Sequence, residues 1–147
     1  RKRKQIASIK VGDRPRGIAF RPDGKVAYVA SEIASKVYAI DVVSRKVIKE
    51  IKTGNFCNGV TMAPDGKRVY ISNGKDGTVS AIDTSDNSVL ATIPVGKRPW
   101  NMAITPDGKK LYVANGRSNS VTVIDTEQLS ASGEIKVGDM PWGVVIR

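Results

Sequence analysis

Four residues with binding chemistry recur at intervals of 42 along the 147-residue sequence. They are Arg16, Asn58, Trp100 and Trp142. Exposed tryptophans beside arginines can stack on sugar rings, nucleobases or the side chains of a partner. Other cationic and apolar residues lie near them, and the full predicted binding set is Arg14, Arg16, Phe56, Asn58, Lys75, Arg98, Trp100, Arg117 and Trp142.

Residues for catalysis are much scarcer. The sequence has no histidine, which excludes Ser-His-Asp and Cys-His nucleophiles and His-ligated zinc within this chain. Its one cysteine, Cys57, can form no internal disulfide and no thiolate cluster. A hydrolase or lyase would have to use carboxylates such as Asp13, Asp76 or Asp139, but these lack the paired spacing of acid/base catalysis. We therefore expect no catalytic residue, metal site or cofactor.

The net charge of +10 raises the question of an anionic partner such as nucleic acid. Much of this charge lies in residues 1–4 and beside predicted turns, which favours a solvated basic face. Carboxylates also offset the arginines near the predicted binding set, namely Asp13, Glu32, Asp76 and Asp139. Nucleic acid is therefore an open but disfavoured partner. No run of about 18 apolar residues occurs, so no membrane span is expected.

The spacing of 42 belongs to an internal repeat that spans the chain. The stretch "RPDGKVAYVAS" at residue 21 returns as "APDGKRVYISN" at 63 and "TPDGKKLYVAN" at 105. Alignment gives three full units, residues 11–52, 53–94 and 95–136, inside a single segment covering 1–147. A period of 40 to 45 residues is typical of the blades of a β-propeller.

Each unit holds four short runs with strand character, which in the first unit are "GIAF", "VAYVA", "KVYAID" and "KVIKEI". Between the first two runs, proline, aspartate and glycine suit a type I turn with a glycine bulge. Aspartates that end the third run can bond to their own turn backbone. The predicted structural turn residues are Pro22, Asp23, Gly24, Pro64, Asp65, Gly66, Pro106, Asp107, Gly108, Asp41, Asp83 and Asp125.

These features predict an all-β fold of four-stranded antiparallel blades. The pattern "GxxPxxVAVSPDGKxxYVAN…VSVIDT" resembles the YVTN-type β-propeller repeat family, with residues 28–31, 70–73 and 112–115 at the name-giving motif. The resemblance implies a seven-bladed or similar parent ring, often without enzymatic activity, in a periplasmic or extracellular location. Two departures are Cys57, where the other units have proline, and "ASEIAS" after the second run of the first unit.

Partial units flank the three repeats. By alignment, residues 5–11 would be the last strand of a preceding blade. Residues 137–147 would begin a following blade, with residues 143–147 as its first strand. Three blades alone leave two apolar faces in water, and a face of about 600 Å² forgoes up to ~15 kcal/mol. We therefore expect other blades, from the same parent chain or from a second copy, to close the ring.

The leading functional hypothesis is a non-enzymatic binding or assembly scaffold. The loops before the inner strands would hold a protein or carbohydrate at one rim, through the predicted binding set. Single-stranded nucleic-acid binding through the same arginines and tryptophans is the first alternative. The second is an accessory protein or a hydrolase or lyase of a redox or catabolic pathway, with active residues outside this segment. Both tryptophans could instead plug the channel entrance and pack on neighbouring loops.

Overall fold

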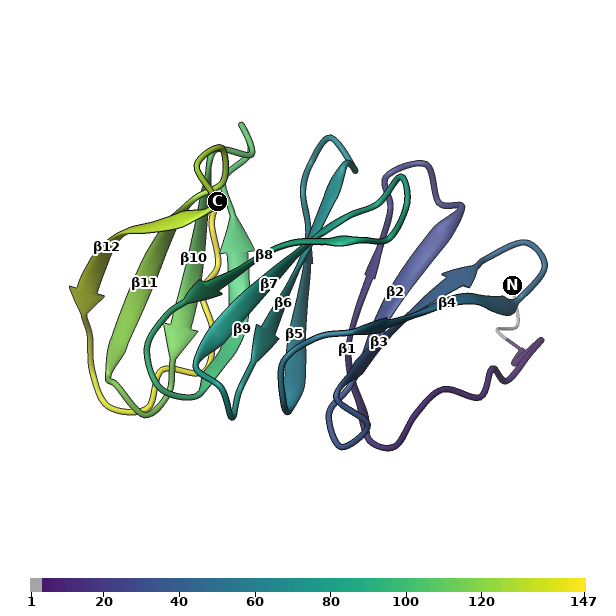
Figure 1. Cartoon of the computed structure of the whole chain (residues 1–147), viewed down its shortest axis with the longest axis horizontal. Coiled ribbons are helices and arrows are strands. Elements are labelled where there is room, and N and C mark those ends of the chain that lie inside the picture. Colours follow the sequence, from purple (N-terminus) through teal and green to yellow (C-terminus); the bar gives the residue numbers. More distant parts are fainter. Residues whose placement is uncertain (1–3) are drawn as a thin grey trace.

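Each 42-residue unit forms one antiparallel sheet in the computed structural model, which describes residues 4–147 (Figure 1). The first sheet has β1 (Pro15–Phe20), β2 (Val26–Ser31), β3 (Lys36–Asp41) and β4 (Lys46–Lys52). The second has β5 (Cys57–Met62), β6 (Arg68–Asn73), β7 (Thr78–Asp83) and β8 (Val89–Pro94). The third has β9 (Pro99–Ile104), β10 (Lys110–Asn115), β11 (Ser120–Asp125) and β12 (Ser130–Lys136).

The strands follow one another within each sheet, so each sheet is a four-stranded meander like a propeller blade. The three sheets stand side by side, with β1, β5 and β9 as neighbouring inner strands (Figure 1). The predicted all-β class and the four-stranded blades are confirmed. Among the described residues there is no helix long and apolar enough to cross a bilayer.

The proline-aspartate-glycine turns close the hairpin between the first two strands of each blade. In the first blade, the Gly24 amide donates to the Arg21 carbonyl at 2.8 Å, and Gly24 has a φ of 70°. The Asp23 carboxylate accepts the Lys25 amide at 3.0 Å. Glycine suits this position because a side chain is strained at positive φ. The same two bonds recur at Asp65–Gly66 and Asp107–Gly108.

The aspartates at the ends of the third strands bond to the next turn. Asp41 accepts the Ser44 amide at 2.6 Å, Asp83 the Ser85 amide at 2.8 Å, and Asp125 the Glu127 amide at 2.9 Å. The hydrogen bonds from Ser44 lower the pKa of Asp41, and those from Ser85 lower the pKa of Asp83, because they stabilise the carboxylate. These hydrogen bonds stabilise the turns that follow the third strands.

The core lies between adjacent blades. Tyr28, Val37 and Ile51 of the first blade pack with Val69 and Ile71 of the second, and all five are buried. The second interface uses the equivalent positions 42 residues on, namely Tyr70, Val79, Ile93, Leu111 and Val113. The repeat therefore supplies two complementary faces to every blade.

Cys57 belongs to the first interface, at the place where proline starts the other inner strands. Its thiol is buried and lies 3.3 Å from the carbonyl oxygens of Ser31 and Lys36, to which it donates. Burial raises the pKa of the Cys57 thiol because the thiolate would lose its hydration. The side chain thus acts as a small core residue.

The inner strands approach one another closely. A Cβ atom on Gly17 would lie 2.4 Å from the carbonyl oxygen of Asn58, and one on Gly59 would lie 2.3 Å from that of Trp100. Only glycine fits at such contacts, because real Cβ atoms stay beyond about 3 Å from backbone atoms. These glycines set the spacing of the residues at the mouth.

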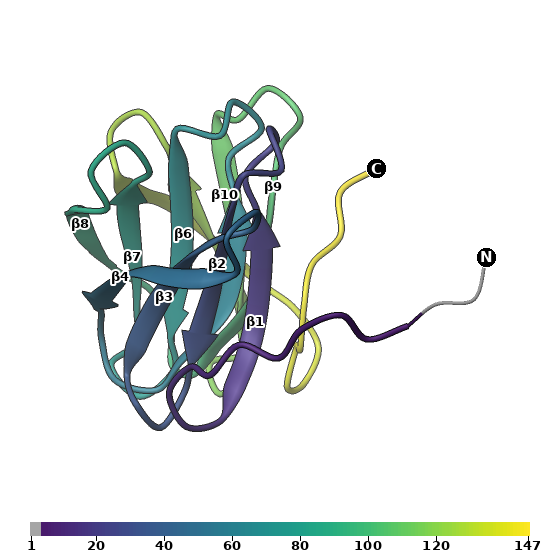
Figure 2. The ribbon, with the colours of Figure 1, turned by 90° about the vertical axis from the view of Figure 1, so that its right-hand side faces the viewer.

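The two flanking segments do not form the strands expected from the alignment. Residues 5–11 and 143–147 pair with none of the three sheets, so neither acquires the ladder that defines a strand. Both segments run on the side of β1 and β9 (Figure 2). Ile9 and Val11 pack on the outer face of the first blade, against Ala27, Val29 and Ile40. Their assignment to further blades stays a prediction.

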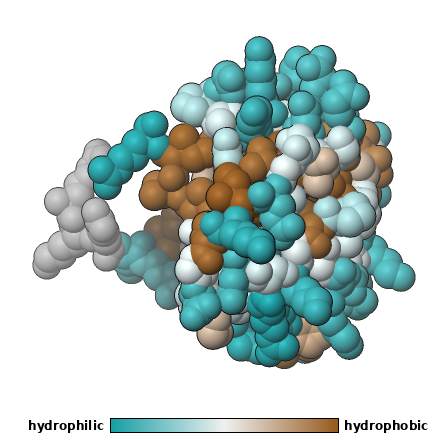
Figure 3. Space-filling view, turned by 90° about the vertical axis from the view of Figure 1, so that its left-hand side faces the viewer, coloured by the Kyte–Doolittle hydropathy of each residue, from teal (hydrophilic) through white to brown (hydrophobic). Residues whose placement is uncertain are grey.

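The third blade ends in an open apolar face. Apolar residues gather in the middle of this face, with hydrophilic residues above and below (Figure 3). Ile135 is exposed to 49%, whereas its equivalents Ile51 and Ile93 are exposed to 4% and 2% between blades. The same side chain that is core in two blades therefore faces solvent in the third.

Candidate functional site

One rim carries the loops that precede β1, β5 and β9, together with the loops that join the second and third strands, at the bottom of Figure 1. The residues that lie two positions before Arg16, Asn58, Trp100 and Trp142 all have a left-handed backbone. Their φ angles are 58° at Arg14, 57° at Phe56, 59° at Arg98 and 51° at Met140. A positive φ is costly for residues other than glycine. Because this backbone conformation recurs with the repeat, the Cα–Cβ bonds of these residues point in equivalent directions.

Each inner strand is also irregular at this end. The pairing register shifts between Pro15 and Gly17, between Cys57 and Val60, and opposite Pro99 in the third blade. Such bulges redirect a side chain out of the normal alternation. Arg16, Asn58 and Trp100 lie at these shifts and line a common pocket.

This mouth pocket has a volume of about 350 Å³. It is lined by Arg14, Arg16, Glu32, Phe56, Asn58, Arg98, Trp100, Asn101 and Trp142. Seven of the nine residues in the predicted binding set therefore meet in one place. Glu32 and Asn101 are additions that the sequence-based set lacked.

Glu32 joins the two arginines of the first blade. Its Oε2 atom lies 2.9 Å from Arg16 Nε and 3.2 Å from Arg14 Nε. The Glu32 side chain is only 7% exposed, while those of Arg14 and Arg16 are 52% and 42% exposed. A nearly buried carboxylate requires such partners. Both contacts use Nε, which leaves the terminal nitrogens of both guanidinium groups for a ligand.

The two tryptophans form a stacked pair. Their ring centroids are 4.0 Å apart with an interplanar angle of 15°. Trp100 packs over Gly116, where a Cβ atom would lie 2.2 Å from the indole Cζ3. Trp142 is 66% exposed. Trp100 is thus packed on a neighbouring loop, as in the channel-plug alternative, whereas Trp142 presents apolar surface to solvent.

Trp142 occupies the place of a next inner-strand residue. The Asn101 amide donates to the Trp142 carbonyl at 3.3 Å. The equivalent positions Gly17 and Gly59 lie against the carbonyls of Asn58 and Trp100. Residues 42 apart therefore follow one another around the mouth, blade by blade.

The two remaining members of the predicted set, Lys75 and Arg117, line a neighbouring groove instead. Arg98 lines both this groove and the mouth pocket. Two cations lie over the Phe56 ring, with Lys75 Nζ at 5.7 Å and Arg98 Cζ at 5.8 Å from its centroid. These cation–π contacts orient the ring, so Phe56 is less available as apolar surface than expected.

Two of the three carboxylates considered for catalysis are used to fix loops. Asp76 accepts the Asn55 backbone amide at 2.7 Å and its side-chain Nδ2 at 3.0 Å, and Asp139 accepts Asn119 Nδ2 at 3.0 Å. Neither Asp76 nor Asp139 lines the mouth pocket, nor does Asp13. Within residues 4–147, no group of three His, Cys, Asp or Glu side chains is placed to hold a metal ion.

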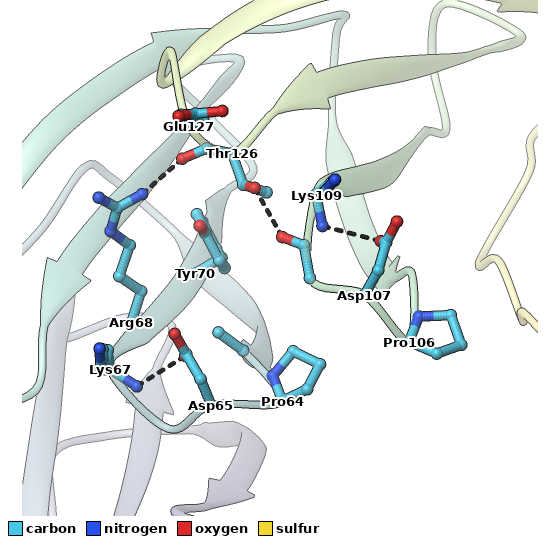
Figure 4. Close-up of a pocket in the computed structure, with 12 residues that line it drawn as sticks. Pro64, Asp65, Lys67, Arg68, Tyr70, Pro106, Asp107, Lys109, Thr126 and Glu127 are labelled. Carbon is cyan, nitrogen blue, oxygen red and sulfur yellow. Dashed lines mark hydrogen bonds between the residues drawn. The ribbon is translucent and has the colours of Figure 1, made fainter.

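The opposite rim has a larger pocket, about 680 Å³, between the second and third blades (Figure 4). Three of the charged side chains that line it are bonded to the backbone. The Asp65 and Asp107 carboxylates accept backbone amides at 3.0 Å, and the Arg68 guanidinium donates to the Thr126 carbonyl. This mixture of opposite charges bound to the scaffold favours a structural role for that rim.

Glu32 could have been found from the sequence by reading the repeat for exceptions. The equivalent residues are Gly74 and Gly116, and all three donate a backbone amide to the carbonyl of the left-handed residue opposite. The fold of the loop is kept with glycine at this position, so packing does not explain the charged residue in the first unit. The "ASEIAS" departure marked this loop without identifying the carboxylate.

Comparison with known proteins identifies the family of the chain. Residues 2–139 match the family described as "Lactonase, 7-bladed beta-propeller". The chain belongs to this lactonase family of seven-bladed β-propellers. No curated protein matches the chain.

Solved structures with different printed names share this fold. A Kuenenia stuttgartiensis hydrazine synthase chain is 26% identical with a TM-score of 0.85, covering 97% of this chain and 42% of that one. A putative 6-phosphogluconolactonase from Bacteroides fragilis is 28% identical with a TM-score of 0.78, covering 88% and 40%. Its Bacteroides uniformis counterpart is 29% identical with a TM-score of 0.78, covering 90% and 43%. The chain thus spans less than half the length of these structures.

Proposed function

We propose that the mouth pocket binds a small anionic sugar derivative of the sugar-acid class, held through its carboxylate. The observation that carries the proposal is the sharing of one Glu32 oxygen by Arg14 and Arg16. Glu32 contacts the Nε atom of each arginine and so fixes the position of both guanidinium groups. The terminal nitrogens of these groups can then form charge-assisted hydrogen bonds to a carboxylate of the ligand. The exposed face of Trp142 supplies an apolar surface for the carbon skeleton of the ligand beside them.

Calorimetric titration with D-gluconate tests this binding. The Arg14→Ala/Arg16→Ala variant should bind at least about tenfold more weakly, because each charge-assisted bond contributes about 1.5–3 kcal/mol. The matched control is Arg45→Ala/Lys46→Ala, which removes two exposed charges, one of them from a residue with a φ of 58° like Arg14. Equal affinity of both variants would refute the site.

Hydrolysis of a lactone is a second candidate function for the ring to which these blades belong. The lactonase family and the two putative 6-phosphogluconolactonases favour this candidate. It differs from the leading hypothesis of the sequence analysis, which was a non-enzymatic scaffold. In this scheme the Glu32 carboxylate accepts a proton from water, and the hydroxide adds to the lactone carbonyl carbon. The arginines stabilise the oxyanion, and the ring C–O bond breaks as the proton passes to the ring oxygen.

The hydrolytic proposal is tested by following acid release from a phosphorylated sugar lactone against its uncatalysed hydrolysis. Glu32→Gln should abolish any rate above background while leaving gluconate affinity measurable. Acceleration that survives Glu32→Gln would reject Glu32 as the base. The absence of acceleration in the unsubstituted chain, with gluconate binding intact, would favour the non-enzymatic scaffold.

The blades also support two proposals carried by the repeat motif. The second strands, with "YVAS", "YISN" and "YVAN", favour assignment to the YVTN repeat type and thereby a periplasmic or extracellular location. The open apolar face of the third blade favours closure by further blades of a parent chain or by a second copy. Cell fractionation tests the first, and the mass of the chain in solution tests the second.

A further inference from the structure

A groove beside the mouth concentrates positive charge. It has a volume of about 470 Å³ and lies between the loop after β6 and the residues before β9. We call it the basic groove and define it by its four cations, Lys75, Lys97, Arg98 and Arg117. Arg98 also lines the mouth pocket, so its side chain lies at the junction of the two.

The charge of the basic groove is not compensated within residues 4–147. None of its four cations forms an ion pair there, in contrast to Arg14 and Arg16 at the mouth. The one carboxylate that lines the groove, Asp76, accepts the amide and the side chain of Asn55. An anionic partner would therefore meet cations that are not already paired with carboxylates of this chain.

The propeller framework does not require this cluster. Between the first and second blades, the residues equivalent to the four cations are Ile33, Asn55, Phe56 and Lys75. The backbone repeats there, since the Lys75 amide donates to the Asn55 carbonyl as the Arg117 amide donates to the Lys97 carbonyl. Three of the four cations are therefore absent from an otherwise equivalent gap.

Arg98 is the counterpart of Arg14, two repeat units later. Their φ angles are 59° and 58°, and their carbonyl oxygens accept equivalent amides, from Gly116 at 3.0 Å and from Glu32 at 2.9 Å. Arg14 pairs through Nε with the Glu32 carboxylate at 3.2 Å. The third blade has Gly116 in place of Glu32, so its arginine lacks that carboxylate.

The missing carboxylate leaves an unsatisfied donor. Arg98 Nε is buried and has no hydrogen-bond partner in the structure. An unpaired buried donor is unfavourable, so turning the guanidinium group toward a carboxylate in the groove would relieve that cost. The first blade thus identifies the kind of anion that fits this position, which is the side-chain carboxylate of a glutamate or aspartate.

The walls of the groove suit a peptide. Gly74, Gly77 and Gly96 line it, and the lack of side chains at these positions lets the backbone of another chain approach closely. No aromatic side chain is among the lining residues, whereas single-stranded nucleic acid is held largely by stacking of its bases on aromatic rings. These features favour an acidic peptide over a nucleic acid.

We propose that the basic groove is a docking surface for an acidic segment of a partner protein. Arg98 binds one carboxylate of the segment, as Arg14 binds Glu32, and the three other cations pair with neighbouring carboxylates. This surface is separate from the ligand proposed for the mouth, and neither proposal depends on the other.

Fluorescence anisotropy with labelled octaglutamate tests the docking surface at a fixed, low salt concentration. The unsubstituted chain should bind octaglutamate and not octaglutamine. Lys97→Ala/Arg117→Ala should weaken this binding at least about tenfold, because both cations are exposed in the groove. The matched control, Lys109→Ala/Lys110→Ala, removes two exposed cations beside the turn on the opposite rim and should keep the affinity.

Gly74→Glu tests the role of Arg98 by supplying a carboxylate from within the chain. Gly74 is the second-blade equivalent of Glu32, and a Cβ there would lie 3.9 Å from Arg98 Cδ. The new carboxylate should pair with Arg98 and repel octaglutamate, which weakens binding at least about tenfold. Gly74→Gln adds the same bulk without charge and should keep most of the affinity. This pair separates the charge from the contact of the added Cβ with the Phe56 carbonyl oxygen at 3.3 Å.

Four results would overturn the proposal. The first is the failure of octaglutamate to bind the unsubstituted chain. The second is an equal loss in both double variants, which would mean a general field of positive charge. The third is a labelled oligothymidylate that binds more tightly than octaglutamate and depends on Lys97 and Arg117, since the groove would then be a nucleic-acid site. The fourth is equal binding by Gly74→Glu and Gly74→Gln, which would reject Arg98 as the partner of a carboxylate.

Discussion

Gly116 controls the tryptophan pair, and its replacement by alanine should separate the two rings. The added Cβ would lie 2.2 Å from Trp100 Cζ3, whereas carbon atoms in contact stay about 3.5–4.0 Å apart. The Trp100 indole must therefore retreat by more than about 1 Å, which breaks a stack with centroids 4.0 Å apart. Overpacking of this kind lowers the free energy of unfolding by about 1–3 kcal/mol.

Circular dichroism is a sharp assay for this change because the chain contains only two tryptophans and both belong to the pair. Stacked indoles give an exciton-coupled signal, which Gly116→Ala should abolish. The control is Gly133→Ala, since a Cβ there meets nothing within 4 Å. An unchanged exciton signal in Gly116→Ala, with both variants folded, would refute the packing described for Trp100.

Three further outcomes follow from single side chains. Tyr28→Phe removes the hydroxyl that donates to Asn87 Oδ1 at 2.8 Å and should cost about 1 kcal/mol in urea unfolding; no measurable cost would show that the bond contributes nothing. The ion pair with Arg21 lowers the pKa of Asp23 to about 2, so the stability it adds is present above pH 3.8 and is lost as the pH falls through 2. NMR titration should show that pKa rising in Arg21→Ala, and an unchanged value would reject the pairing. Because burial raises the pKa of the Cys57 thiol, a thiol reagent should label it only after unfolding, and rapid native labelling would contradict its burial.

The blade architecture was predictable because the repeat states it three times. Strands β1, β5 and β9 begin at residues 15, 57 and 99, and the glycine turns recur with φ near 70° at Gly24, Gly66 and Gly108. A turn with fixed φ requirements leaves a clear mark on the sequence. The repeat also indicated that residues 42 apart would meet at one rim, and seven of the nine binding-set residues do line one pocket.

The details of the site were less predictable because they depend on exceptions to the repeat. Glu32 stands where the other blades have glycine, and its role appears only when both arginines are seen to share its oxygen. The division between the mouth pocket and the neighbouring groove of Lys75 and Arg117 depends on the direction of each side chain, which spacing alone does not give. Lys97, absent from the predicted set, lies beside Arg98 and belongs to the groove.

The flanking segments illustrate a different limit. Alignment assigned residues 5–11 and 143–147 to strands, but a strand exists only with a neighbour to pair with. Ile9 and Val11 instead pack on the outer face of the first blade. The alignment identified these segments by their similarity to strands, but it could not supply the neighbour with which they would pair.

A structure of the chain with D-gluconate bound tests the central claim most directly, namely that successive inner strands build one anion-binding mouth. We predict the carboxylate on Arg14 and Arg16 and the carbon chain beside Trp142. Ligand bound only in the pocket of the opposite rim, near Arg68, would contradict it.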